Sequence, residues 1–227
     1  EVEVLDADCT ILAVAPRGPV PTSVLLEFQD GTGVLLPAVP EFTAELTFGS
    51  GQLAAVTYEP SIGSGRRTEY DQRAGRLRSL RAAIAASVSL GAFQLKADNA
   101  LSLARQMQIS KGVDPSMALY AAYAYHDLQR RDLINEMGRF MYEDLKSVFF
   151  DIALLSGKLG PGTARSTDIV PHCPMLAQGW SLLSAFRVRL PGVLQDLAQH
   201  LLPSVWSTFD PPGVRKLDDA IRQREIQ

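Results

Sequence analysis

The sequence has only three histidines and two cysteines, and one of each stands side by side. His172 and Cys173 are adjacent and flanked by Pro171 and Pro174. A cysteine nucleophile needs an imidazole beside it in space to take its proton, an arrangement that adjacent residues do not have. No further His or Cys stands at zinc-site spacing. We therefore expect a rigid loop bend, with no catalytic residue, no metal and no cofactor.

The motifs of common enzyme classes are missing from the sequence as well. It has no G-x-S-x-G elbow, no G-x-x-x-x-G-K-[ST] phosphate loop and no G-x-G-x-x-G after a strand. The adjacent carboxylates at 143–144 and 218–219 point different ways on a helix and do not form an acid–base couple. Because catalytic triads assemble in space, an enzyme built from scattered residues stays an open alternative.

Arginines form the most marked charged feature. Positions 66–81 hold six arginines and two acids. Arg66, Arg73 and Arg76 fall near one flank of a predicted helix, where they could bind a phosphate-bearing ligand such as a nucleotide, or an acidic partner. The alternative is a solvated helix face that pairs with acids of the strands. Residues 63–67, at the start of this helix, are either an anion-binding turn or a flexible linker.

A second candidate surface belongs to segment 114–132, which is rich in tyrosine and alanine. Its apolar residues follow two stripes at helical spacing, which predicts a helix buried on two sides with its tyrosine hydroxyls bonded to polar partners. The alternative is a concave recognition face. Under that alternative, the exposed candidates on this segment and beyond it are Tyr123, His126, Arg130, Arg139 and Trp180.

The elements that must position these side chains change character along the sequence. Residues 24–36 read as a hairpin around a Gly-containing turn, and 42–48 alternate as a half-buried strand that returns after a Gly-Ser-Gly turn. Helical spacing begins after a linker. We predict an α+β protein with a small antiparallel β-sandwich or barrel over 1–60, a linker over 61–67 and an all-α, repeat-like helical domain over 68–227.

Local signals refine the helical part. Asp114 suits the N-cap of a helix and Pro115 its first position. The helix pair over 114–145 has the length and the small/aromatic pattern of a tetratricopeptide-type hairpin, although only one such unit is legible. Residues 157–174 form a Gly/Pro-rich loop long enough to be functional.

Bulk properties narrow the partners and the compartment. The 227 residues are 46% hydrophobic with a net charge of −3, so we expect no nucleic-acid partner. No stretch approaches about 18 consecutive apolar residues, so we expect no membrane span. Two distant cysteines, Cys9 and Cys173, read as free thiols of a reducing cytosol, which predicts a cytoplasmic protein. Since the sequence starts at Glu1 without an initiator Met, we expect a fragment or a processed product.

Several stretches together are similar to a known family. They are LLEFQDGTGVLLPAVPEFTAELTF, VTYEPS, DPSMALYAAYAYHDLQRRDLINEM with FFDIALLSGKL, and CPMLAQGWSLL with LLPSVWSTFDPPGV. Over residues 10–215 the chain resembles the C-terminal accessory region that follows the protease domain in bacterial caspase-family (peptidase C14-like) proteins. In that family the protease domain carries a His and Cys dyad. The sequence contexts of that dyad are missing here, so no catalytic residue is carried over.

The resemblance implies a role beside a protease. It suggests an accessory module that docks on, senses for or restrains a caspase-like domain, in the same or a separate chain, in antiviral defence or regulated cell death. Two other hypotheses stay open. The chain could sense a phosphate-bearing nucleotide through its arginines, or it could be a free-standing scaffold or inhibitor protein.

Overall fold

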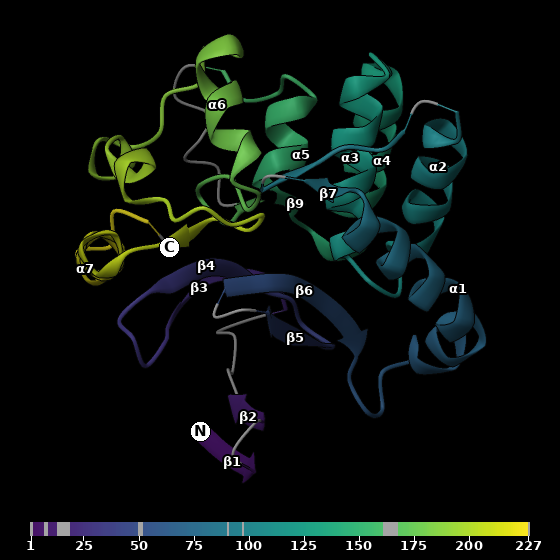
Figure 1. The fold of residues 1–227 in the computed structure, drawn as a ribbon, viewed down its shortest axis with the longest axis horizontal. Coiled ribbons are helices and arrows are strands. Elements are labelled where there is room, and N and C mark those ends of the chain that lie inside the picture. The colour runs from purple at the N-terminus through teal and green to yellow at the C-terminus, as the bar shows by residue number, and fades with distance from the viewer. Residues whose placement is uncertain are drawn as a thin grey trace.

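The fold is mixed α+β. Antiparallel strands come first in the chain, and a mostly helical part follows, with seven α-helices among the residues described below. In Figure 1 the strands β3 to β6 form a curved layer, the helices stand on one side of it, and the N-terminus lies on the other. The computed structural model describes residues 2–6, 9–12, 19–49, 52–89, 91–96, 98–160 and 168–226.

Three hairpins make up the N-terminal part. Strands β1 (Val2–Asp6) and β2 (Cys9–Leu12) pair with each other. Strands β3 (Thr22–Glu27) and β4 (Gly33–Ala38) form the hairpin predicted over 24–36. Its turn is closed by the Asp30 carboxylate, which accepts hydrogen bonds from the backbone N–H and the hydroxyl of Thr32 at 2.9 and 2.6 Å. The prediction of this hairpin is therefore confirmed.

The third hairpin consists of β5 (Phe42–Gly49) and β6 (Gln52–Pro60). This confirms the predicted strand over 42–48 and its return. The Tyr58 hydroxyl donates to the carbonyl oxygen of Pro37 at 2.8 Å, so β6 is tied to the end of β4. The two hairpins are thereby held together by a side chain as well as by apolar packing.

The second part is mostly helical rather than all-α as expected. Its short strands are β7 (Val88–Ser89), β8 (Ala92–Phe93), β9 (Val148–Phe149), β10 (Ile169–Val170) and β11 (Thr208–Phe209). Strand β11 pairs antiparallel with β4, because the edge of β4 that β3 leaves open has backbone groups to satisfy. The helices are α1 (Arg67–Ala86), α2 (Ala100–Ser110), α3 (Ser116–Asp127), α4 (Arg131–Leu145), α5 (Phe150–Leu155), α6 (Gln178–Ala185) and α7 (Pro211–Arg222), with 3₁₀ turns η2 (Gly192–Leu194) and η3 (Leu197–His200).

Helix α3 is the central helix of the fold. All of its residues up to Tyr125 are buried, and it packs against α2, α4 and α5. The carboxylate of Asp114, itself buried, accepts from the backbone N–H and the hydroxyl of Ser116 at 3.1 and 2.6 Å. The N-cap position is Pro115 rather than Asp114 as predicted, and the helix begins at Ser116, but the Asp114 carboxylate still bonds to this first residue.

Two apolar clusters meet at β4. Val34 and Leu36 belong to the larger cluster, which joins the strands to α1, α2, α3 and α4. Leu35 points the other way, into a second cluster around α5, α7 and Phe209. Because successive side chains of β4 enter different clusters, the strands and the helices share their core.

Candidate functional site

Most arginines of α1 are used to attach this helix to its surroundings. Arg66 forms a bidentate pair with Asp144 at 2.6 and 3.0 Å and donates to the carbonyl oxygen of Gly112 at 3.0 Å. Arg73 pairs with Glu69 at 2.7 Å and donates to the carbonyl oxygen of Ile109 at 2.9 Å. Two of the three arginine candidates, Arg66 just before α1 and Arg73 on it, are therefore engaged by acids and by carbonyl oxygens at and just after the end of α2.

Arg81 makes the most buried of these attachments. Its guanidinium lies 2.8 Å from the carboxylate of Asp114, which also accepts from the backbone N–H of Tyr58 at 3.1 Å. Burial raises the pKa of Asp114, and Arg81 opposes that effect. This network fixes α1, the end of β6 and the start of α3 relative to one another.

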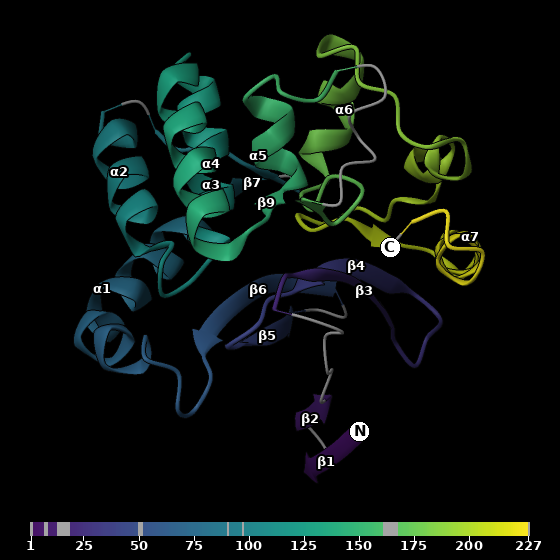
Figure 2. The same ribbon diagram turned by 180° about the vertical axis from the view of Figure 1, so that it is seen from behind.

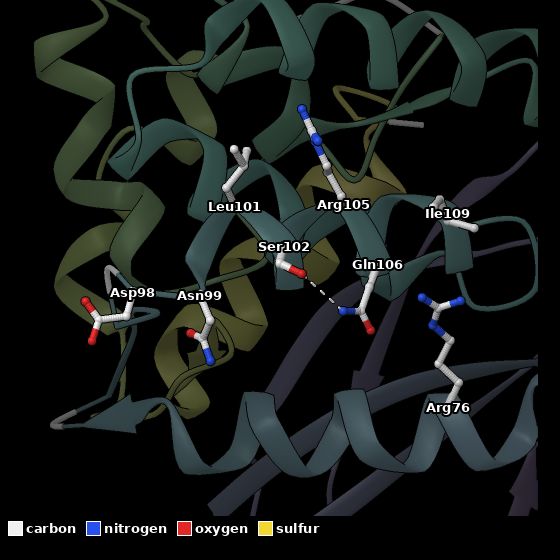
Figure 3. Close-up of a pocket in the computed structure, with 8 residues that line it drawn as sticks. All are labelled: Arg76, Asp98, Asn99, Leu101, Ser102, Arg105, Gln106 and Ile109. Carbon is white, nitrogen blue, oxygen red and sulfur yellow. Dashed lines mark hydrogen bonds between the residues drawn. The ribbon is translucent and has the colours of Figure 1, made fainter.

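Arg76 is the candidate that stays available. It lines a hollow of about 500 Å³ between α1 and α2. Here we call this hollow the α1–α2 groove, and Figure 3 shows its residues. Within the described part of the chain, neither Arg76 nor the groove residue Arg105 has an ion-pair partner. The full lining of the α1–α2 groove is Arg76, Asp98, Asn99, Leu101, Ser102, Arg105, Gln106 and Ile109.

The pattern of α2 explains why these residues face outward. Ala100, Ala104 and Met107 recur at helical spacing and are buried, so the opposite side of α2 is left to polar residues. Ser102 and Gln106 lie one turn apart on that side, where the Gln106 amide donates weakly to the Ser102 hydroxyl at 3.4 Å. Small buried side chains thus bring α2 close to α3 and present a polar face beside α1.

The two ends of the α1–α2 groove differ in charge. Figure 3 shows Arg76 reaching from α1 toward α2 beside Ile109, and Asp98 with Asn99 at the opposite end. Arg105 also lines the groove, but its side chain leaves α2 in the direction away from α1 and from Arg76 (Figure 3). A guanidinium group without an ion-pair partner among the described residues, such as that of Arg76, can hold a carboxylate or a phosphate through paired hydrogen bonds. The α1–α2 groove is therefore a candidate anion-binding site.

The candidates on α3 and near it do not form one exposed surface. The expectation that Tyr123 is exposed is wrong: its side chain is 1% exposed, and its hydroxyl donates to the carboxylate of Asp151 at 2.5 Å. His126 is half-buried with its ring 5.8 Å from that of Phe186. Arg130 pairs with Asp132 through two hydrogen bonds of 2.9 and 2.7 Å.

Arg139 and Trp180 have opposite environments. Arg139 is exposed and lies over the Phe140 ring, 4.7 Å from its centroid. The expectation that Trp180 is exposed is wrong, since it is 8% exposed and its indole N–H donates to the Ser207 hydroxyl at 2.8 Å. Its ring also meets Phe209 edge-on. Trp180 is thus part of the second apolar cluster, because α6 turns this face toward the residues that precede α7.

His172 and Cys173 lie in a buried loop that a carboxylate anchors. Asp151 of α5 is fully buried and accepts from the backbone N–H groups of Met175 and Leu176 at 2.7 and 3.3 Å. Burial raises the pKa of Asp151 to about 6. Burial, with Asp151 nearby, also raises the pKa of the Cys173 thiol, which makes it a poor nucleophile. Asp151 therefore anchors the residues that directly follow the predicted loop bend, through hydrogen bonds from their backbone N–H groups.

Asp151 and most residues of the α1–α2 groove are not among the candidates that the sequence predicts. The signal for Asp151 was a lone acid within the apolar stretch FFDIALL, since an acid is buried in such a place only with partners. The signal for the groove was the recurrence of polar residues from Asn99 to Gln106 at helical spacing.

Metal and membrane features are not seen in the described ranges. No three His, Cys, Asp or Glu side chains converge there as a possible metal site. None of the described helices combines the length and the apolar character needed to cross a membrane.

Comparison with known proteins gives no match for this chain, whether among protein-family models, curated proteins or solved structures.

Proposed function

We propose that this chain is a non-catalytic interaction module of a bacterial caspase-like protease system, and that its α1–α2 groove recognises an anionic group there. The observation that carries the proposal is the pair Arg76 and Arg105, which line one hollow without an ion-pair partner in the described part of the chain. The sequence resemblance to the region after a caspase-like domain supplies the biological setting.

The contrast with the other arginines supports this assignment. Arg66, Arg73 and Arg81 each pair with an acid and also bond to a backbone carbonyl. Such contacts serve the structure. Among the residues that the structure describes, Arg76 and Arg105 have none of these partners, and cations that line a concave surface raise the local concentration of anions. Their positions are therefore suited to a ligand or a partner rather than to the fold.

The arrangement of the elements gives the α1–α2 groove a stable frame. We propose that the strands form a small sandwich or barrel and that the helices form a repeat-like array. In Figures 1 and 2, α2 stands at the outer side of the helices, with α1 below it. Both helices that form the groove are fixed in place. Helix α2 packs against α3, and α1 is attached through the ion pair between Arg81 and Asp114. A rigid frame lowers the entropy lost on binding.

A binding experiment tests this function. The chain is titrated calorimetrically into the caspase-like domain encoded with it, and protease activity is followed in parallel. We expect a complex, which the double change Arg76→Ala with Arg105→Ala weakens by about tenfold or more, the loss expected from charge-assisted hydrogen bonds. Arg78→Ala is the matched control, because Arg78 is exposed on α1 but does not line the groove.

The outcomes separate the alternatives. No complex tighter than about 1 mM would contradict the role in a protease system. A complex that is unaffected by the double change would contradict the role of the groove. Where a complex forms, a fall in protease activity identifies the module as a restraint, and a rise identifies it as an activator.

A further inference from the structure

We propose that the α1–α2 groove binds a nucleoside monophosphate whose base carries an exocyclic amino group. The phosphate lies at the Arg76 end and the base at the Asp98 end. This inference rests on the proposed function, because it names the ligand class of the same groove.

The separation of charge along the groove limits the anionic part of the ligand. Arg76 lies at one end of the view in Figure 3 and Asp98 at the other, with Ser102 and Gln106 between them. An acidic peptide or a polyphosphate that filled the whole groove would bring negative charge against the carboxylate of Asp98. A ligand with one compact anionic group at the arginine end avoids this repulsion.

The carboxylate of Asp98 defines the other end of the ligand. A carboxylate accepts hydrogen bonds, and it favours a partner with N–H donors. The Asn99 amide beside it supplies both a donor and an acceptor. An amino-substituted base offers N–H donors next to ring acceptors, which complements this pair of side chains.

The size of the groove agrees with one nucleotide. Its volume of about 500 Å³ lies within the range of about 300–1,000 Å³ that is usual for small-molecule sites. From Asn99 to Gln106, α2 advances about 10 Å at about 1.5 Å per residue. That distance is comparable to the length of an extended mononucleotide, and a dinucleotide would extend beyond it.

The middle of the groove supplies contacts for a sugar and for the face of a base. The Ser102 hydroxyl and the Gln106 amide form only the long 3.4 Å hydrogen bond with each other, so both can turn to sugar hydroxyls. Leu101 gives an apolar surface near the Asp98 end (Figure 3). Apolar walls with a few polar groups that fix the orientation are the usual composition of such sites.

Calorimetric titrations of the purified chain test this ligand class. The probes are AMP, IMP, adenosine, ribose 5-phosphate, inorganic phosphate and a hexaglutamate peptide. We expect AMP to bind, and IMP to bind about tenfold more weakly because a carbonyl oxygen replaces its amino group. Adenosine lacks the phosphate and should not saturate the site. Arg76→Ala should weaken AMP binding by about tenfold or more, and Arg78→Ala should leave it unchanged.

Asp98→Asn gives a readout that general loss of charge does not produce. It should remove most of the difference between AMP and IMP, because the amide can donate to the carbonyl of IMP. Binding of ribose 5-phosphate should not fall with this change. Circular dichroism of each variant confirms that the chain is folded.

Several results would overturn the inference. AMP that binds no better than inorganic phosphate, equal affinities for AMP and IMP, or an equal effect of Arg78→Ala would each refute it. Preference for the hexaglutamate peptide would refute a nucleotide as the ligand of the groove, but it would still support recognition of an anionic partner. Conversely, AMP binding without any complex with the protease domain would refute the proposed setting and retain the ligand.

Discussion

Replacing Asp151 with asparagine should remove a pH-dependent loss of stability. Burial raises the pKa of this carboxyl group from its ordinary 3.8 to about 6, although Tyr123 and two backbone N–H groups stabilise the ionised form. The folded chain therefore holds the proton more tightly than the unfolded chain does. The resulting stability is fully present below about pH 4 and is lost as the pH rises through about 6.

The size of this effect follows from the same two values. The gap between 3.8 and about 6 corresponds to about 3 kcal/mol of unfolding free energy, because each pH unit is worth about 1.36 kcal/mol. According to proton linkage, about 2 kcal/mol of that stability is lost as the pH rises from 4.5 to 7. The free energy of unfolding of the wild type, minus that of Asp151→Asn, should therefore fall by about 2 kcal/mol as the pH rises from 4.5 to 7.

Urea unfolding at several pH values measures this difference. The comparison with Asp151→Asn is essential, because other groups such as Asp114, whose pKa burial also raises, add their own pH dependence. The amide of the variant loses one acceptor, which lowers its stability by the same amount at every pH. The same substitution at the exposed Asp196 controls for the loss of a charge. Parallel curves for the wild type and Asp151→Asn would refute the reasoning.

Three further changes test other contacts. Arg81→Ala leaves the buried Asp114 without its cationic partner and should lower the free energy of unfolding by about 3 kcal/mol; a loss under about 1 kcal/mol in urea unfolding would contradict this. Gly179→Ala places a Cβ 2.8 Å from the Cβ of Pro174, so thermal unfolding should show a destabilisation of about 1–3 kcal/mol, and an unchanged midpoint would argue against the packing. The Cys173 thiol, buried and with a raised pKa, should be alkylated only after unfolding, as mass mapping of its peptide can show; rapid labelling of the folded chain would exclude its burial.

Features that depend on neighbouring residues were predictable from the sequence. The hairpin β3–β4 follows from a Gly-containing turn between apolar runs, and β5 follows from strict alternation. The burial of α3 follows from its two apolar stripes, and the expected hydroxyl partners exist: Tyr125 donates to Gln108 at 2.5 Å, and Tyr123 donates to Asp151. In each case the physical cause lies within a few residues of the element.

Features that depend on distant segments were not predictable. Tyr123 is covered because Asp151, in another helix, accepts its hydrogen bond. Trp180 is covered because Ser207 and Phe209, which lie later in the chain, contact its ring. The α1–α2 groove needs two helices placed side by side, and the spacing of arginines on α1 could supply only Arg76 of its lining.

Strand β11 also has a consequence for biosynthesis. Thr208 lies opposite Val34, so this pairing joins positions that are 174 residues apart (208 minus 34). The hydroxyl of Ser204 bonds to the carbonyl of Leu53 over a similar span of 151 residues. During translation, the edge of β4 therefore stays unpaired until almost the whole described chain has left the ribosome. Closure between such distant positions is intrinsically slow, and a nascent chain with an open strand edge is prone to aggregate. Strand β11 therefore covers the edge of β4 only late in the synthesis of the described chain.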